Sequence, residues 1–374
     1  LVRSKNTVVI CIKNVGLFSI AGVAYYLIGY NLMYAGVDGG YFGSLSIWSS
    51  GIGSDSDLIG QDYSPASDWF FQMVFVATTA SIVSGALAER VLIWPFFAFV
   101  TILTAILYPI SGSWQWGGGW LSEMGFSDFA GSTIVHSVGG WAALTGAILL
   151  GARKGKFDSK GNASVMPGQS IPMATLGVWI LWLGWFGFNG ASQLALGSYA
   201  DANAVASIFA NTTMAAAGGV IAPMALSRIV DGKTNISATL NGAIAGLVSI
   251  TAEPLTPTIG QAIIIGGIGG ILCMYGMKLL DKLKIDDVVG AIPAHLIAGI
   301  WGTIIVPFTN TDTSYGIQII GILAFGVFTV VTTSIIWSIL KMSIGIRASE
   351  EDEEYGLDIT ETGTSGYPEY VSKK

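Results

Sequence analysis

The sequence contains the stretch Asp128-Phe-Ala-Gly131-Ser-Thr-Ile-Val-His136-Ser-Val-Gly-Gly140, which aligns without gaps to Asp287-Val-Val-Gly290-Ala-Ile-Pro-Ala-His295-Leu-Ile-Ala-Gly299. The two copies agree at the aspartate, the first glycine, the histidine and the last glycine. Both histidines of the chain lie in this motif, each eight residues after its aspartate. We interpret the two stretches as an internal repeat.

The repeat lies in a strongly apolar chain. Of its 374 residues, 52% are hydrophobic and only 11% are charged, against about 25% in an ordinary soluble domain. A net charge of -7 argues against a basic nucleic-acid binder, and the apolar content argues against a disordered chain. The composition therefore indicates a multi-pass membrane protein.

Ten apolar segments are candidates for spans, because roughly 20 helical residues cross about 30 Å of hydrocarbon. They cover residues 8–35, 68–88, 92–110, 128–150, 171–194, 202–225, 236–251, 259–279, 288–306 and 315–340. We predict an all-α membrane domain over residues 1–345 and a cytoplasmic tail over residues 346–374. The tail is acidic, and on charge alone we expect it to be solvated.

The basic residues predict which side each loop faces, because Lys and Arg favour cytoplasmic loops. They fall on one side of a ten-span count, at Arg3, Lys5, Arg90, residues 153–160, Arg228, Lys233, residues 278–284 and Lys341. The opposite loops hold no Lys or Arg but carry Asp38, Asp55, Asp57, Asp62, Glu123, Asp201, Glu253 and Asp312. We therefore expect both chain ends inside, and an outer face whose negative potential attracts cations.

With these sides, span 128–150 runs inward and span 288–306 runs outward, so the repeat is inverted. Inverted repeats are typical of transporters, whose pathway lies near the membrane midplane. Eight residues at 1.5 Å per residue place each histidine about 12 Å from its aspartate, so the two histidines could meet at mid-membrane. One basic residue, Lys13, lies near a span interior, and we expect it to snorkel to the inner boundary.

The histidine pair could be two core residues satisfied by backbone groups, but the shared spacing favours function. Two imidazoles without carboxylate or cysteine partners make a poor metal site, so no metal or cofactor is expected. Neutral imidazoles suit a small polar solute or a proton relay. The spans hold no deep Asp or Glu, and the chain has no hydrolase or P-loop motif, so we predict no enzyme activity and no ATP-driven transport.

Three aromatic segments are candidates for a cation site, although helix packing explains their spacing equally well. Residues 114–120 read Trp-Gln-Trp-Gly-Gly-Gly-Trp and lie on the outer side, where an indole could face a cation. The second segment holds Phe71, Gln72 and Phe75, and the third holds Phe188 and Ser192 one helical turn apart.

Taken together, these residues resemble the ammonium transporter family, the Amt/Mep/Rh group. The resemblance covers almost the whole chain and rests on Asp68-Trp-Phe-Phe-Gln-Met-Val-Phe75, Gly85-Ala-Leu-Ala-Glu-Arg90, residues 128–136, Gly184-Trp-Phe-Gly-Phe-Asn189, residues 287–295 and Gly356-Leu-Asp358. Family members usually have eleven spans and an outside N-terminus. The chain starts at Leu1 and matches ten spans, so we expect the first span to be missing by truncation.

The resemblance implies a role for individual residues. Trp116, Phe75 and Ser192 would recruit ammonium at the outer face, with Asp128 stabilising that site indirectly. Phe75 and Phe188 would stack as a gate, and His136 with His295 would line a narrow hydrophobic pore. Phe71, Gln72 and Asp287 would support these groups. The family is typically homotrimeric, and its tail commonly docks against the body and takes part in regulation by PII-type signalling proteins. In this tail Glu361-Thr362-Gly363 stands where many members have Glu-His-Gly.

The prediction is therefore a transporter for ammonium or ammonia in the cell membrane, with a cytoplasmic C-terminus. An ammonium sensor that signals through its tail or a partner is the alternative, although no kinase or cyclase domain follows the last span. A gas channel of the Rh type is a third reading. It would keep the histidine pair but would not need Trp116 or Ser192.

Overall fold

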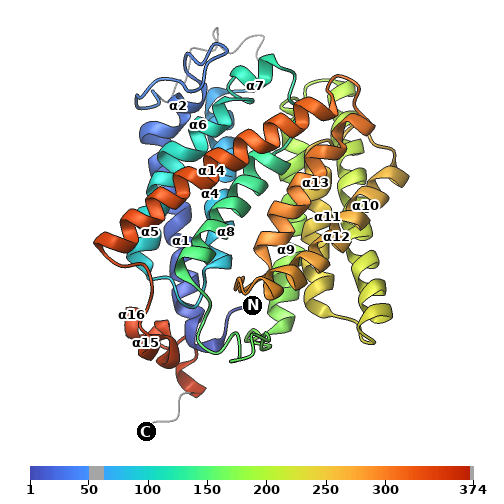
Figure 1. The fold of residues 1–374 in the computed structure, drawn as a ribbon. Coiled ribbons are helices and arrows are strands. Elements are labelled where there is room, and N and C mark those ends of the chain that lie inside the picture. Colours follow the sequence, from blue (N-terminus) through green and yellow to red (C-terminus); the bar gives the residue numbers. More distant parts are fainter. Residues whose placement is uncertain (50–62, 371–374) are drawn as a thin grey trace.

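Apolar helices make up most of the computed structural model, which describes residues 1–49 and 63–370 (Figure 1). The α-helices are α1 (Thr7–Ala24), α2 (Tyr30–Tyr34), α4 (Pro65–Ala86), α5 (Ile93–Ile102), α6 (Tyr108–Ser113), α7 (Trp120–Glu123), α8 (Val138–Leu150), α9 (Ile171–Gly190), α10 (Tyr199–Val230), α11 (Ile236–Thr251), α12 (Ile259–Lys282), α13 (Ala298–Ile305), α14 (Tyr315–Ser343), α15 (Glu350–Tyr355) and α16 (Leu357–Thr362). Wider π-helical turns lie at η2 (Tyr25–Gly29), η3 (Leu103–Leu107), η4 (Ser132–Ser137) and η6 (Ile292–Ile297).

Eight helical segments in the described part of the chain are long and apolar enough to cross a membrane. They are Ser4–Tyr34, Pro65–Ala86, Ile93–Ser113, Ser132–Leu150, Ile171–Gln193, Tyr199–Val230, Ile259–Lys282 and Tyr315–Ser343. The other two predicted spans coincide with the shorter apolar helices Ile236–Thr251 and Ile292–Phe308. The all-α multi-pass class is confirmed, whereas the count of ten spans is not.

Side-chain caps fix where several of these helices begin. The Ser198 hydroxyl accepts a hydrogen bond from the Asp201 amide, and the Asp201 carboxylate accepts one from the Ser198 amide. Thr258 and Gln261 form the same reciprocal cap at the start of α12. Each cap satisfies amides that have no partner inside the helix. Asp201 is therefore a helix cap as well as an acidic residue of a predicted outer loop.

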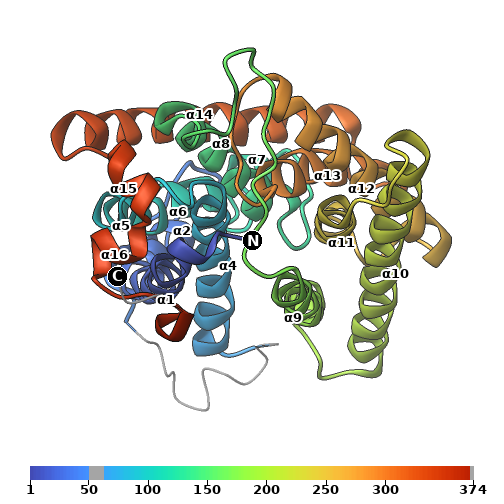
Figure 2. The same cartoon turned by 90° about the horizontal axis from the view of Figure 1, so that it is seen from below.

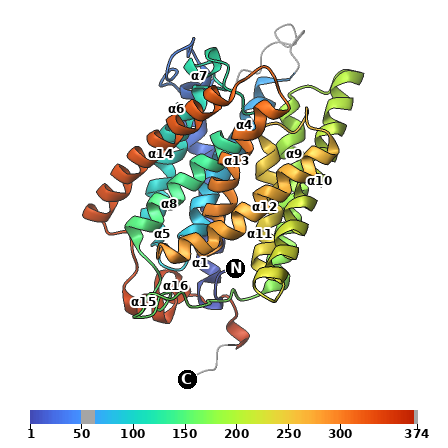
Figure 3. The ribbon, with the colours of Figure 1, turned by 45° about the vertical axis from the view of Figure 1, so that its right-hand side comes forward.

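The helices form two groups (Figures 1 and 2). One group contains α1, α4, α5 and α8, and the other contains α9 to α12. The helix α14 runs obliquely along the outside of the bundle and packs on α8 (Figure 3). In the second group, α10, α11 and α12 approach so closely that Gly219, Gly246 and Gly266 have no space for a Cβ atom. Small residues at such positions let the backbones of membrane helices come together.

The two copies of the motif fold alike. The Asp128 carboxylate accepts hydrogen bonds from the amides of residues 131–134 at 2.8–3.0 Å and so caps η4. The Asp287 carboxylate accepts from the amides of residues 289, 290 and 292 at 2.7–3.3 Å and so caps η6. Gly131 and Gly290 have φ angles of 104° and 78°, a conformation that favours glycine.

The two copies also run in opposite directions, as predicted. Just beyond the end of α8, Arg153 pairs with Asp286, which lies just before η6 (Nε to Oδ2, 2.8 Å). At the other end, the Gln318 amide links Ser127, before η4, to the Thr303 carbonyl of α13.

The last glycine of each copy faces the residue after the histidine of the other. A Cβ on Gly140 would lie 2.6 Å from Cβ of Leu296, and a Cβ on Gly299 would lie 2.5 Å from Oγ of Ser137. The two π-helical turns are in direct contact at this crossing. The glycines therefore allow both histidines to reach the middle of the bundle.

The tail packs against the body rather than being merely solvated. The Asp358 carboxylate accepts a hydrogen bond from the Val9 amide (2.9 Å), and the Glu361 carboxylate accepts one from the Ile93 amide (2.6 Å). The Leu357 amide donates to the Asn6 side chain (3.0 Å), and Leu357 itself is fully buried. The charge pattern does not predict this contact, because these carboxylates cap the free amides at the starts of α1 and α5.

The Lys13 side chain is buried, so the expectation that it snorkels is wrong. Its Nζ donates to the Ser84 carbonyl (3.1 Å) and lies 4.5 Å from the centre of the Phe96 ring. Helices α4 and α5 cover α1 on this side, and they supply a carbonyl and a ring face in place of water.

Candidate functional site

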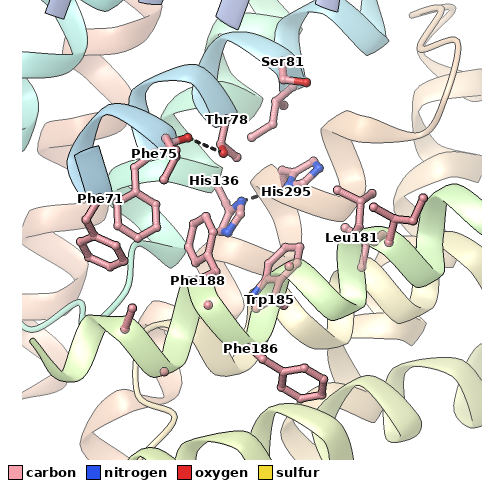
Figure 4. A pocket seen from close by; sticks show the side chains of 18 of the residues that line it. Phe71, Phe75, Thr78, Ser81, His136, Leu181, Trp185, Phe186, Phe188 and His295 are labelled. Carbon is pink, nitrogen blue, oxygen red and sulfur yellow. Dashed lines mark hydrogen bonds between the residues drawn. The ribbon is translucent and has the colours of Figure 1, made fainter. Parts of the chain in front are cut away.

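The two histidines meet at the centre of the bundle (Figure 4). Their Nδ1 atoms lie 3.1 Å apart, and their ring centres lie 5.2 Å apart. At this distance one Nδ1 donates and the other accepts. In a neutral pair one Nε2 is then an acceptor and the other an N–H donor. Across residues 1–49 and 63–370, no three His, Cys, Asp or Glu side chains group to hold a metal ion.

A cavity of about 1210 Å³ contains this pair. Its lining follows α4 from Asp68 to Gly85, faces α9, and includes both histidines. The Nε2 atom of His136 is buried and has no hydrogen-bond partner among the described residues. Buried polar atoms are nearly always paired, so this atom is available to a small polar molecule in the cavity.

Aromatic rings stand beside the histidine pair (Figure 4). Phe75 of α4 and Phe188 of α9 have ring centres 4.3 Å apart at an interplanar angle of 77°. The resemblance implies that these two rings stack. They do lie side by side, but they meet edge to face. His136 does stack, on Phe188 at 5.1 Å and on Trp185 at 5.0 Å. Phe71 also packs on the Phe75 ring edge to face, at 4.6 Å.

Trp116 extends the aromatic cluster away from the histidines. Its ring centre lies 5.7 Å from that of Phe75, and its indole N–H donates to the Asp128 carbonyl (3.0 Å). The Asp128 side chain is buried and holds the start of η4 by four amide hydrogen bonds. One residue thus orients both the indole and the turn that carries His136.

One predicted recruiting residue, Ser192, and one predicted supporting residue, Gln72, are less closely tied to the cluster. The Ser192 hydroxyl donates to the Phe188 carbonyl one turn earlier (2.8 Å), so its hydrogen bond stays within its own segment. Gln72 is buried, and its Oε1 has no hydrogen-bond partner in the described part of the chain.

Comparisons with known proteins show the family to which the chain belongs. The model of the Ammonium Transporter Family matches residues 1–367. The chain belongs to the ammonium transporter family. This is a family of membrane transporters rather than of enzymes.

Curated relatives match along most of their length. A putative ammonium transporter of Synechocystis sp., sll1017, is 43% identical over 366 residues, which cover 96% of this chain and 81% of the relative. The ammonium transporter Amt2 of Archaeoglobus fulgidus is 39% identical over 400 residues, which cover 99% of this chain and 83% of the relative.

Solved structures share the fold. One described as Sensor Amt Protein superposes with a TM-score of 0.90 at 33% identity, covering 96% of this chain and 91% of the other. The crystal structure of Candida albicans Mep2 gives a TM-score of 0.79 at 26% identity, covering 95% of this chain and 82% of the other.

Trp185 is a residue of this site to which the sequence alone assigns no role. The Trp185 ring is almost fully buried and lies parallel to His136 at an interplanar angle of 17°. Its place three residues before Phe188 on the same helix was the available signal, since residues at i and i+3 share a face.

A buried charge network below the histidines was also missed. Arg153 binds the Asp286 carboxylate through two nitrogens (2.8 and 2.9 Å) and pairs with Glu89 (3.1 Å), which also pairs with Arg3. Burial opposes ionisation of Asp286, but the hydrogen bonds from Arg153 and the charge of Arg90 outweigh it and hold the pKa of Asp286 at about 2. Burial likewise opposes ionisation of Glu89, and the charges of Arg153 and Arg3 lower its pKa.

This network stabilises the end of the pathway near the tail. Asp286 directly precedes Asp287, the cap of η6, so its ion pair anchors the turn that carries His295. The Arg90 guanidinium donates to the Asp286 carbonyl (2.6 Å) and is itself fully buried. Asp55, Asp57 and Asp62, which were predicted on the opposite face, lie outside the described residues.

Proposed function

We propose that this chain conducts ammonium by binding the ion at an outer aromatic site and removing its proton. Ammonia and the released proton then pass separately along the histidine pair, so that net charge crosses the membrane. Trp116, Phe75 and Ser192 recruit the ion, and Asp128 stabilises their arrangement. The rings of Phe75 and Phe188 form a gate that must open for passage, and His136 and His295 line the pore beneath it. Phe71, Gln72 and Asp287 support these groups.

The proposal rests on one observation: His136 and His295 lie together in a largely apolar cavity, next to the ring pair Phe75 and Phe188. One Nε2 acceptor and one N–H donor match a neutral ammonia molecule, which both donates and accepts. A largely apolar pore excludes hydrated sodium and potassium. Potassium is similar in radius to ammonium, but it cannot donate a hydrogen bond or lose a proton. Selectivity therefore comes from proton chemistry rather than from size.

The proposed location is the cytoplasmic membrane, with both chain ends on the cytoplasmic side. The side is assigned by Lys and Arg, which gather around the tail: Lys5 donates to the carbonyls of residues 353 and 354, and Arg347 pairs with Glu353.

The proposed assembly is a homotrimer with one pathway per subunit, and a PII-type protein at the cytoplasmic face is the proposed regulatory partner. The mass of the complex in detergent tests the trimer. Pull-down with a purified PII-type protein tests the partner. This tail has Glu361-Thr362-Gly363 where many family members have Glu-His-Gly, so the sequence supports PII binding less strongly than it supports transport.

Ammonium-evoked current on solid-supported membranes that carry the reconstituted protein tests the function. The proposal predicts a transient current with ammonium and none with potassium at the same concentration. Equal currents with both ions would contradict it. A pH-jump flux assay distinguishes electroneutral ammonia conduction if ammonium evokes no current.

A sensor is the second candidate, because the solved structure with a TM-score of 0.90 is described as Sensor Amt Protein. A pure sensor binds ammonium and changes its tail or its partner without appreciable flux. Binding measured together with absent current and absent ammonia flux would support this reading, whereas sustained flux would reject it.

A further inference from the structure

A carboxylate lies at the outer end of the cavity. Asp68 lies in the first turn of α4, and its side chain lines the same cavity as Phe71, Phe75 and both histidines. Asp68, Phe71 and Phe75 are spaced i, i+3 and i+7, so they share one face of the helix. Seven residues at 1.5 Å per residue put Asp68 about 10 Å along the helix from Phe75.

The Asp68 carboxylate is buried without a basic partner. The residue is 8% exposed, and the Tyr30 hydroxyl donates to its Oδ2 at 2.6 Å. In the part of the chain that the structure describes, no Lys, Arg or His lies within ion-pair distance of it. Aspartate is seldom buried unpaired, because removing its charge from water is costly. A cation in the cavity would supply the missing partner.

We propose that Asp68 is a further recruiting group for ammonium, which draws the ion into the cavity before it reaches the rings of Phe75 and Trp116. The inference rests on the proposed function and adds a specificity residue to it. Asp68 attracts cations by charge, and the aromatic rings and the histidines then select ammonium. From the sequence, Asp68 is known only as the start of a span and of the motif that ends at Phe75, because its side chain cannot be placed in the cavity without the fold.

A purely structural role is the competing explanation. In that case Asp68 serves only to accept the hydrogen bond of Tyr30 and so to join α2 to α4. The two roles are separable, because Asp68→Asn removes the charge but keeps an oxygen acceptor for Tyr30. Tyr30→Phe removes the hydrogen bond but keeps the charge.

The experiment measures the ammonium concentration that gives half-maximal current in the reconstituted full chain. A single charge about 10 Å away predicts an increase on the order of three- to tenfold in Asp68→Asn, with little change in the maximal current. Asp68→Glu should restore the wild-type value within about twofold. Tyr30→Phe should stay near wild type, as should Asp312→Asn, which removes an exposed outer carboxylate.

The proposal is overturned if Asp68→Asn keeps the wild-type half-maximal concentration, or if Tyr30→Phe reproduces its effect. Failure of the proposed function has a different outcome, since the wild type itself would then show no ammonium-specific current.

Discussion

Asp128 and Asp287 make the same kind of cap at opposite ends of the histidine pair. Asp128 accepts four backbone amide hydrogen bonds at the start of the turn with His136, and Asp287 accepts three at the start of the turn with His295. Each carboxylate thus fixes a π-helical turn, a local widening that is common at functional sites. The two copies of the motif therefore bring two imidazoles together from opposite directions.

Replacing Asp128 by Asn should destabilise the protein more than the same change at Asp287. The NH2 group of an asparagine side chain cannot accept a hydrogen bond, so Asp128→Asn leaves two of the four bonds unmade and costs on the order of 3 kcal/mol. Asp287→Asn can keep the bonds from the Val289 and Gly290 amides, which share one carboxylate oxygen, so it leaves one bond unmade and should cost about 1 kcal/mol. Thermal unfolding in detergent ranks the two variants. Equal losses would show that the caps are not what stabilises the turns.

Adding one methyl group at the crossing of the repeats should disrupt packing. Gly140→Ala and Gly299→Ala each place a Cβ within about 2.6 Å of the other copy, which costs on the order of 2 kcal/mol or more. Gly177→Ala in α9 adds the same methyl where no atom lies within 4 Å, so it should be neutral or slightly stabilising. Midpoint temperatures of the three variants provide the check. A loss at Gly177 as large as at Gly140 would reject the packing explanation.

The hydrogen bond of Trp116 should matter separately from its ring. Trp116→Phe keeps an aromatic face but removes the N–H that donates to the Asp128 carbonyl. We expect the half-maximal ammonium concentration to rise about threefold, because the ring loses its fixed orientation, and to rise further in Trp116→Leu, which also loses the cation–π contact. Trp179→Phe, on an exposed tryptophan of α9, is the matched control. Identical values for Trp116→Phe and wild type would show that the indole N–H has no role.

The Asp286 ion pair should make stability depend on acid pH. Its pKa in the folded protein is about 2, below the ordinary 3.8, so the pair stabilises the folded state fully above about pH 4. The stabilisation, about 2 kcal/mol, is lost as the pH falls towards 2. Asp286→Asn should therefore unfold at a lower temperature than wild type at pH 7, and the difference should shrink below pH 4. A difference that stays constant down to pH 2.5 would contradict the assigned pKa.

The sequence predicted the features that depend on local pattern. Apolar length located the membrane helices, and the spacing from Asp128 to His136, repeated at Asp287, predicted an inverted pair of histidines. The resemblance selected Phe75, Phe188 and Trp116, which do lie in one cluster. The caps made by Asp128 and Asp287 were not predicted, although an aspartate followed three residues later by glycine is a local pattern that sequence reasoning could have used.

Features that need the fold could not be predicted in this way. The pairing of Arg153 with Asp286 joins residues 133 positions apart, and the contact of Asp358 with Val9 joins residues 349 apart. The edge-to-face angle of Phe75 depends on the packing of Phe71 and Trp116 around it. Burial of Lys13 depends on the ring of Phe96 from another helix.

The central claim is that ammonia and the proton released from ammonium pass along the His136 and His295 pair. The most direct test compares the ammonium-evoked current of wild type and His136→Leu in the same liposomes, with matched protein amounts, equal unfolding temperatures as a folding control, and potassium as the ion control. The account predicts a current that is specific to ammonium in wild type and absent in His136→Leu. An undiminished, ammonium-specific current in His136→Leu would contradict it.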